Sequence, residues 1–142
     1  MQGHIFGEPV RNFPGLVFES QDDKTGESVY WMSVRESGWL GRCDKAVIAY
    51  YLFQDGKFAE LHAITTCLGL REEVYRLFGP GKAQKDFLRT VDWEGERVRA
   101  SYSEKLDPPV TCWLKVSSKP LLAVREAKQR AQMQADSALD RL

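Results

Sequence analysis

The sequence lacks the features that would assign it to several large classes of protein. Its 142 residues contain no apolar run near the roughly 18 to 20 residues of a membrane-spanning helix, so we expect no membrane insertion. It also has no net charge, because 20 basic and 20 acidic residues cancel, and no overall field would attract nucleic acid. We therefore expect no general binding to nucleic acid.

Cysteine is also scarce. The three cysteines, Cys43, Cys67 and Cys112, are widely spaced and form no CxxC pair. A zinc site needs closer or paired ligands, and the spacing of His62 and the cysteines does not meet this need, so we predict no metal and no cofactor. A Cys43–Cys67 disulfide stays open if the chain is exported, because both flank the open end of one predicted hairpin; the alternative is three separate buried thiols.

What the sequence does contain is a strong hairpin signal at residues 46–65. Asp55-Gly56 suits a two-residue type I′ turn, in which both central residues take positive φ. An uninterrupted register from this turn would place Tyr51 opposite Glu60. The first strand is apolar on both faces, which is typical of a central strand covered on each side.

Further patterns extend this hairpin into an α+β fold. Apolar spacing predicts a short amphipathic helix over residues 70–78, ended by Gly79-Pro80, and an alanine-rich helix from Pro120. We expect a curved, mostly antiparallel sheet of six or seven strands, with the short helix across one face and the second helix C-terminal. The remaining strand candidates are residues 15–20, 29–34, 87–93, 97–104 and 111–117.

The length is that of one domain, which we place over residues 1–142. We divide it into an extended leader (1–14), the sheet with its helix (15–119) and the C-terminal helix (120–142).

The C-terminal helix has a predicted inner stripe made mostly of alanine. Small residues bury little area each, so this helix gains little from packing alone. It could lie close against the body, project partly solvated, or pair with another copy to give a homo-oligomer. The stripe comprises Val124, Ala127, Ala131, Ala135, Ala138 and Leu142.

The four tryptophans are candidates for ligand contact. Trp31 and Trp113 fall inside predicted strands, where we expect core positions. Trp39 and Trp93 lie beside glycine-containing loops and are the candidate binding residues for a peptide, a sugar or a small apolar ligand. The alternative for both is packing in the core or under a lid.

Glu60 and His62 are two residues apart on one predicted strand and therefore share a sheet face. A carboxylate beside an imidazole could do acid–base work, with a contribution from Asp92 or Cys67. The alternative is a half-exposed strand pair without chemistry.

Two short stretches carry a resemblance to known proteins. Residues 5–10, IFGEPV, and the pattern Tyr51-x-Phe53-x-x-Gly56-x-Phe58 resemble small uncharacterised bacterial domains that are exported, over residues 5–118. The resemblance implies a periplasmic or exported setting with the leader removed, and a binding or accessory role without activity. The start of the chain has no secretory signal, so the cytoplasm is the alternative setting.

We therefore expect a non-enzymatic binding or accessory domain whose partner is an unknown protein or small ligand. One alternative is a small enzyme built on the Glu60/His62 pair. The other is a structural protein that self-associates through the C-terminal helix.

Overall fold

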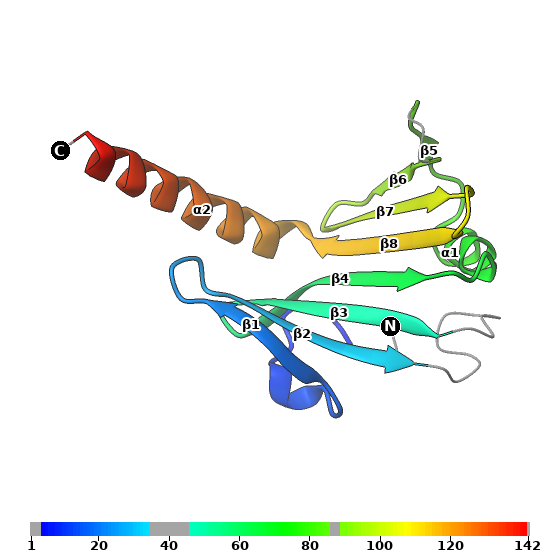
Figure 1. The fold of residues 1–142 in the computed structure, drawn as a ribbon, viewed down its shortest axis with the longest axis horizontal. Helices are drawn as coiled ribbons and strands as arrows, with labels where there is room; N and C mark the ends of the chain where they lie inside the picture. Colours follow the sequence, from blue (N-terminus) through cyan, green and yellow to red (C-terminus); the bar gives the residue numbers. More distant parts are fainter. Residues whose placement is uncertain (1–3, 35–45, 86–88, 142) are drawn as a thin grey trace.

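In a computed structural model, which describes residues 4–34, 46–85 and 89–141, the chain forms an antiparallel sheet of eight strands with two α-helices (Figure 1). The strand order across the sheet is β1-β2-β3-β4-β8-β7-β6-β5. The predicted α+β class is confirmed, but the sheet has eight strands rather than six or seven. The strands are β1 (Val17–Asp22), β2 (Glu27–Val34), β3 (Val47–Gln54), β4 (Lys57–Thr65), β5 (Lys82–Ala83), β6 (Val91–Glu94), β7 (Val98–Lys105) and β8 (Thr111–Ser118).

The strand that the sequence did not predict is β5. It consists of two residues, Lys82 and Ala83, which pair with Asp92 and Val91 of β6. Two residues are too few to show an alternating pattern, so only the pairing with β6 reveals this strand. The neighbouring strand β6 is also shorter than the predicted 87–93, and residues 86–88 lie outside the described residues.

The central hairpin is confirmed at its turn. Asp55 and Gly56 have φ values of 51° and 78°, as a type I′ turn requires. The first pairs from the turn follow the expected order, with Phe53 opposite Phe58. The chain therefore reverses where the Asp-Gly pattern predicts.

The predicted register is wrong beyond those first pairs. A bulge at Ala59 places Glu60 opposite Leu52 and Leu61 opposite Tyr51. Ala59 is thus an extra residue in β4 with no partner in β3. From Glu60 onward, each residue of β4 shares a sheet face with a different set of β3 residues than the prediction gave. Glu60 consequently shares a face with Leu52 and not with Tyr51.

The core lies on one face of the sheet. Helix α1 (Gly69–Phe78) covers one end of this face and buries Leu70 and Val74 completely. The N-terminal segment, with the 3-10 helix η1 (Val10–Asn12), contributes Phe13, whose ring lies 5.0 Å from that of Phe58. The buried strand residues on this face include Ala49, Tyr51, Phe53, Leu61, Ala63, Ala100, Tyr102, Leu114 and Val116.

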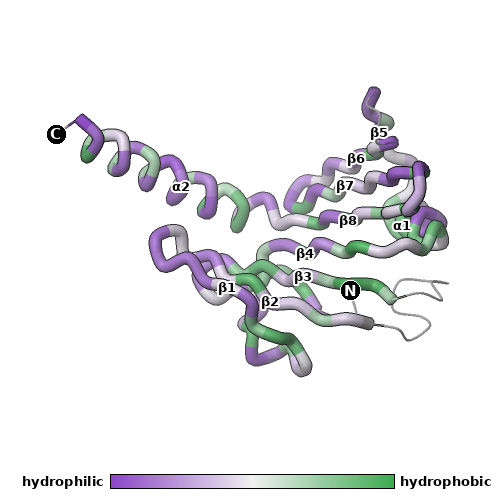
Figure 2. The backbone as a smooth tube through the Cα atoms, viewed as in Figure 1, coloured by the Kyte–Doolittle hydropathy of each residue, from purple (hydrophilic) through white to green (hydrophobic). Residues whose placement is uncertain are grey.

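Helix α2 (Lys119–Asp140) starts where β8 ends. Its N-cap is Ser118, whose hydroxyl accepts a hydrogen bond from the Leu121 amide at 3.4 Å. Only its first turns contact the sheet, and the rest projects away from the body as a largely hydrophilic helix (Figures 1 and 2). No helix in the described part of the chain is both long enough and apolar enough to cross a membrane.

The predicted inner stripe of α2 is wrong. Val124 is 41% exposed, and the alanines at 127, 131, 135 and 138 are exposed as well. The side chains that face the sheet are Leu122, Arg125 and Lys128, which lie on a different side of the helix. The alanine pattern failed because the helix is held by one buried leucine, Leu122, and by the polar contacts of Arg125 and Lys128 rather than by an alanine face.

Candidate functional site

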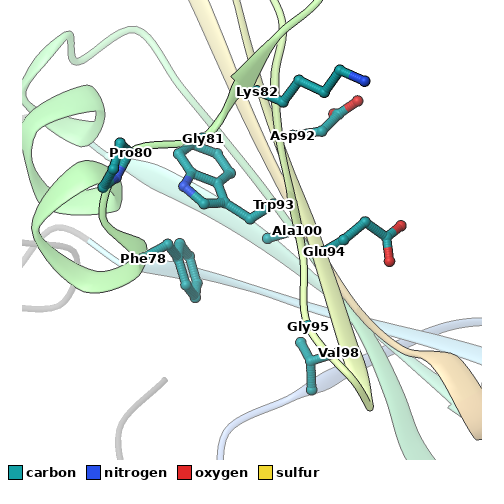
Figure 3. A pocket seen from close by; sticks show the side chains of 10 residues that line it. All are labelled: Phe78, Pro80, Gly81, Lys82, Asp92, Trp93, Glu94, Gly95, Val98 and Ala100. Atoms are coloured by element: carbon teal, nitrogen blue, oxygen red, sulfur yellow. The ribbon is translucent and has the colours of Figure 1, made fainter.

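A groove opens on the core face, between the C-terminal end of α1 and the β6–β7 hairpin (Figure 3). Its volume is about 620 Å³, which is in the range of small-ligand sites. The lining residues are Phe78, Pro80, Gly81, Lys82, Asp92, Trp93, Glu94, Gly95, Val98 and Ala100.

Trp93 is the largest side chain of this groove and is held in place from α1. Its indole Nε1 donates a hydrogen bond to the Gly79 carbonyl oxygen at 2.9 Å, and its ring lies 5.6 Å from that of Tyr75 and 5.8 Å from that of Phe78. A Cβ at Gly81 would stand 2.6 Å from the indole Cε2, so only glycine allows this approach. The turn after α1 and the indole therefore fix each other's position.

The charged residues beside the groove do not converge on Trp93. The side chains of Lys82 on β5 and of Asp92 and Glu94 on β6 project away from the indole (Figure 3). Asp92 accepts a hydrogen bond from Gln84 Nε2 at 2.8 Å. Glu94 forms an ion pair with Lys119, and this contact lowers the pKa of Glu94. The side chains on the Trp93 side of the groove are consequently apolar and aromatic.

A second cavity of about 680 Å³ adjoins the groove, and the two share Phe78 and Val98. It lies between the N-terminal segment, the starts of β7 and α2, and the end of α1. Its lining residues are His4, Ile5, Phe6, Gly7, Lys57, Phe78, Arg97, Val98, Val116, Ser118, Pro120 and Leu121. Together the two cavities form one extended surface on the core side of the sheet, and the side chains that they share, Phe78 and Val98, are apolar.

Glu60 and His62 lie together on the opposite face, with His62 Nε2 3.3 Å from Glu60 Oε1. Glu60 is 1% exposed, and its carboxylate has several other partners. Ser117 Oγ donates to Oε1 at 2.8 Å, and Arg125 Nη1 donates to Oε2 at 2.7 Å. Lys115 Nζ lies 3.3 Å from Oε1. The carboxylate is thus surrounded by donors from β4, β8 and α2.

These contacts decide the charge of Glu60. Burial by itself would raise the pKa of this carboxyl, but the contacts with His62, Arg125 and Ser117 outweigh burial and hold the pKa well below its usual range. A carboxylate with so low a pKa is a poor proton acceptor near neutral pH. The arrangement favours a structural role, in which Glu60 holds the start of α2 on the sheet.

The other tryptophans differ from expectation. Trp31 and Trp113 were expected in the core, but this is wrong: both are half-buried on the face opposite the core, where Trp31 pairs with Tyr50 and Trp113 with Ile64. Trp39 lies outside the described residues, so its binding role stays a prediction. Trp93 lies on the other sheet face from Glu60 and His62, so the predicted binding residues do not form one site.

Of the cysteines, Cys67 is disulfide-bonded and Cys112 is a fully buried free thiol. Burial raises the pKa of Cys112. Cys43 lies outside the described residues, so the predicted Cys43–Cys67 pairing stays a prediction. Among the residues that the structure describes, no group of three or more potential metal ligands occurs.

Comparison with known proteins gives no match: no protein-family model, no curated protein and no solved structure matches the chain. Sequence reasoning singled out Trp93 but missed Phe78 and Val98, and it missed the second cavity entirely. The one local signal for the groove was the Gly79-Pro80-Gly81 turn, which was interpreted only as a helix end.

Proposed function

We propose that the chain is a non-enzymatic ligand-binding domain that uses the groove beside Trp93. The observation that carries this proposal is the apolar wall formed by Phe78, Trp93 and Val98, from which the neighbouring charged side chains turn away. Such a wall offers contact area without groups for acid–base or nucleophilic chemistry. A small apolar ligand, or an apolar side chain of a protein partner, fits this surface.

The alternative of an enzyme at Glu60 and His62 has less support. Glu60 is buried under α2, and its oxygens already accept from Ser117 and Arg125. A substrate would have to displace those donors to reach the carboxylate.

The neutral apolar dye N-phenyl-1-naphthylamine tests the groove. We expect saturable binding, together with a shift of the Trp93 indole N–H resonance in two-dimensional NMR of the unmodified protein. The indole resonances of Trp31 and Trp113, on the opposite face, are the internal control. Absence of binding, or shifts confined to Trp31 and Trp113, would refute the proposal.

A pair of variants sharpens this test. Val98→Lys places a charge in the groove wall and should weaken dye binding at least tenfold. Val17→Lys makes the same change at an exposed position of β1, where Val17 is 47% exposed, and should have no effect. If Val98→Lys does not fold, the NMR shifts of the unmodified protein still decide.

We infer an exported setting for this domain, with the cytoplasm as the alternative. The disulfide at Cys67 supports export, because disulfides persist in oxidising compartments. Free thiols would be trapped by alkylation in the native cells before lysis, and the alkylation would be completed after denaturation, which exposes buried thiols. One cysteine out of three should then be modified. Modification of all three would contradict export.

A second candidate function is self-association through α2. Met133 and Leu139 are 71% and 66% exposed on its projecting half. Sedimentation of the full chain should then show an oligomer, whereas a chain truncated after Gln132, which keeps Leu122 and Arg125, should be monomeric. Two monomers would dismiss this candidate.

A further inference from the structure

The second cavity exists because β8 leaves the sheet early. β8 turns into α2 after Ser118, and the N-terminal segment takes the vacated place beside the start of β4. There the Gly7 amide donates to the Phe58 carbonyl oxygen at 2.8 Å, and the Phe58 amide donates to the Glu8 carbonyl oxygen at 2.8 Å. The space left between this segment and β7 is the cavity.

The interior of this cavity is apolar. Phe6, Phe78 and Val98 are partly buried, and Val116 forms its buried floor. Ile5 adds an apolar side chain that is 69% exposed. An aliphatic chain could cover these side chains and exclude water from them.

Two cations lie in the lining; Asp55, outside it, interacts electrostatically with Lys57 without forming an ion pair. Lys57 and Arg97 are both exposed, and neither forms an ion pair with any acidic residue that the structure describes. His4 also lines the cavity, but it is engaged with Glu8, whose Oε2 lies 2.8 Å from His4 Nδ1. No carboxylate of the described residues is part of the lining. Long basic side chains can cover apolar surface with their stems and keep the charge in water.

We propose that this cavity binds a free carboxylic acid with an aliphatic chain. The chain would lie along Phe6, Phe78 and Val98 toward the Trp93 groove, and the carboxylate would lie between Lys57 and Arg97. The charge complementarity selects an anionic head over a neutral or cationic one. This inference rests on the proposed function, because the two cavities share Phe78 and Val98.

Three ligands of equal chain length test the head group: decanoate, decan-1-ol and decyltrimethylammonium. Their affinities would be measured by displacement of N-phenyl-1-naphthylamine, below the concentrations at which they form micelles. Exposed ion pairs are individually weak, so two of them predict about five- to tenfold tighter binding of decanoate than of decan-1-ol. Because exposed pairs are screened by salt, the preference should shrink at high ionic strength.

Variants identify the cations. Lys57→Gln and Arg97→Gln should each lower decanoate affinity about two- to threefold, and the double variant should remove the preference without changing decan-1-ol binding. Lys105→Gln is the matched control, because Lys105 is exposed at the opposite end of β7 from Arg97 and lines neither cavity.

The outcomes separate this inference from the proposed function. Equal affinity for the three ligands, or a decanoate preference that survives the double variant, would overturn the carboxylate site and leave the groove standing. If neither the dye nor any of the three ligands binds, both fall together. A preference for decanoate that disappears only when Lys57 and Arg97 are replaced supports the inference.

Discussion

Replacing Arg125 by methionine tests whether a buried ion pair holds α2 on the sheet. Arg125 Nη1 lies 2.7 Å from Glu60 Oε2 and 3.2 Å from Glu27 Oε2, and the side chains of Arg125 and Glu60 are 16% and 1% exposed. Removing one member of a buried pair costs about 3–5 kcal/mol when the remaining charge has no other partner. In this variant Glu60 retains its contacts with Ser117 and Lys115. We therefore expect the free energy of unfolding to fall by about 2–3 kcal/mol, which is the contribution of one hydrogen bond to a charged group.

A second ion pair on the same helix provides the control. Lys128 Nζ lies 2.7 Å from Asp55 Oδ1, but both side chains are more than 40% exposed. Lys128→Met should therefore cost less than about 1 kcal/mol. Urea unfolding at pH 7, followed by tryptophan fluorescence, measures both variants. Equal losses from Arg125→Met and Lys128→Met would refute the view that burial makes the Glu60 pair the stronger one.

The same pair predicts a dependence of stability on pH. The pKa of Glu60 is lower in the folded protein than in the unfolded chain, where a glutamate titrates near about 4.3. Its contribution to stability is therefore complete above the unfolded pKa and is lost as the pH falls toward the folded pKa. Glu60→Gln removes this contribution, so its stability should fall less steeply than that of the unmodified protein between pH 5 and pH 2. Parallel slopes would contradict the assignment.

Three further predictions concern the turns and the thiols. Gly81→Ala should cost about 1–3 kcal/mol and shift the Trp93 indole resonance, because its Cβ would overlap the ring; an unchanged spectrum would contradict this contact. Gly56→Ala should cost about 1 kcal/mol, because Gly56 has a φ of 78°; an unchanged thermal midpoint would contradict the positive φ. Without reductant, a maleimide should leave Cys67 unmodified and react with Cys112 only in denaturant; mass spectrometry of the native and denatured protein checks both.

The parts of the fold that the sequence predicted are those decided by neighbouring residues. The Asp55-Gly56 turn and the helix that ends at Phe78 depend on φ values and on spacing within a few positions. The register of β4 could not be predicted, because the extra residue at Ala59 leaves no mark on the alternation. The position of such a bulge depends on the side chains that pack against each face of the strand, and these come from distant parts of the chain.

The same limit explains the errors at the candidate site. Glu60 and His62 do lie side by side, as their spacing predicts, but no local pattern indicates that Arg125, 65 residues further along the chain, covers Glu60. The predicted inward face of α2 is wrong for the same reason. The alanines of this helix outnumber Arg125, the single arginine that contacts Glu60, so the composition of the helix favours the alanine face. Phe78 and Val98 meet only after the chain has folded, so no local pattern joins them.

Both α-helices of the described residues are held on the sheet by an arginine bound to a buried glutamate. Arg71 of α1 donates from Nε to Glu104 Oε2 at 3.0 Å, and Glu104, at 3% exposure, also accepts from the Tyr102 hydroxyl at 2.8 Å. Arg125 of α2 does the same for Glu60 on the opposite face. Isolated buried carboxylates are costly, so these two pairs fix where each helix lies more narrowly than apolar packing alone would.

The positions of the helices in turn set the walls of the two cavities. Phe78 closes α1 and lines both cavities, whereas Leu121 in the first turn of α2 lines the second one. The buried carboxylates thus act on the proposed ligand surface through the helices that they hold, without contacting a ligand themselves. Arg125→Met should therefore weaken decanoate binding even though Arg125 lines neither of these cavities. An unchanged decanoate affinity would show that α2 keeps its position, and the second cavity its wall, without this ion pair.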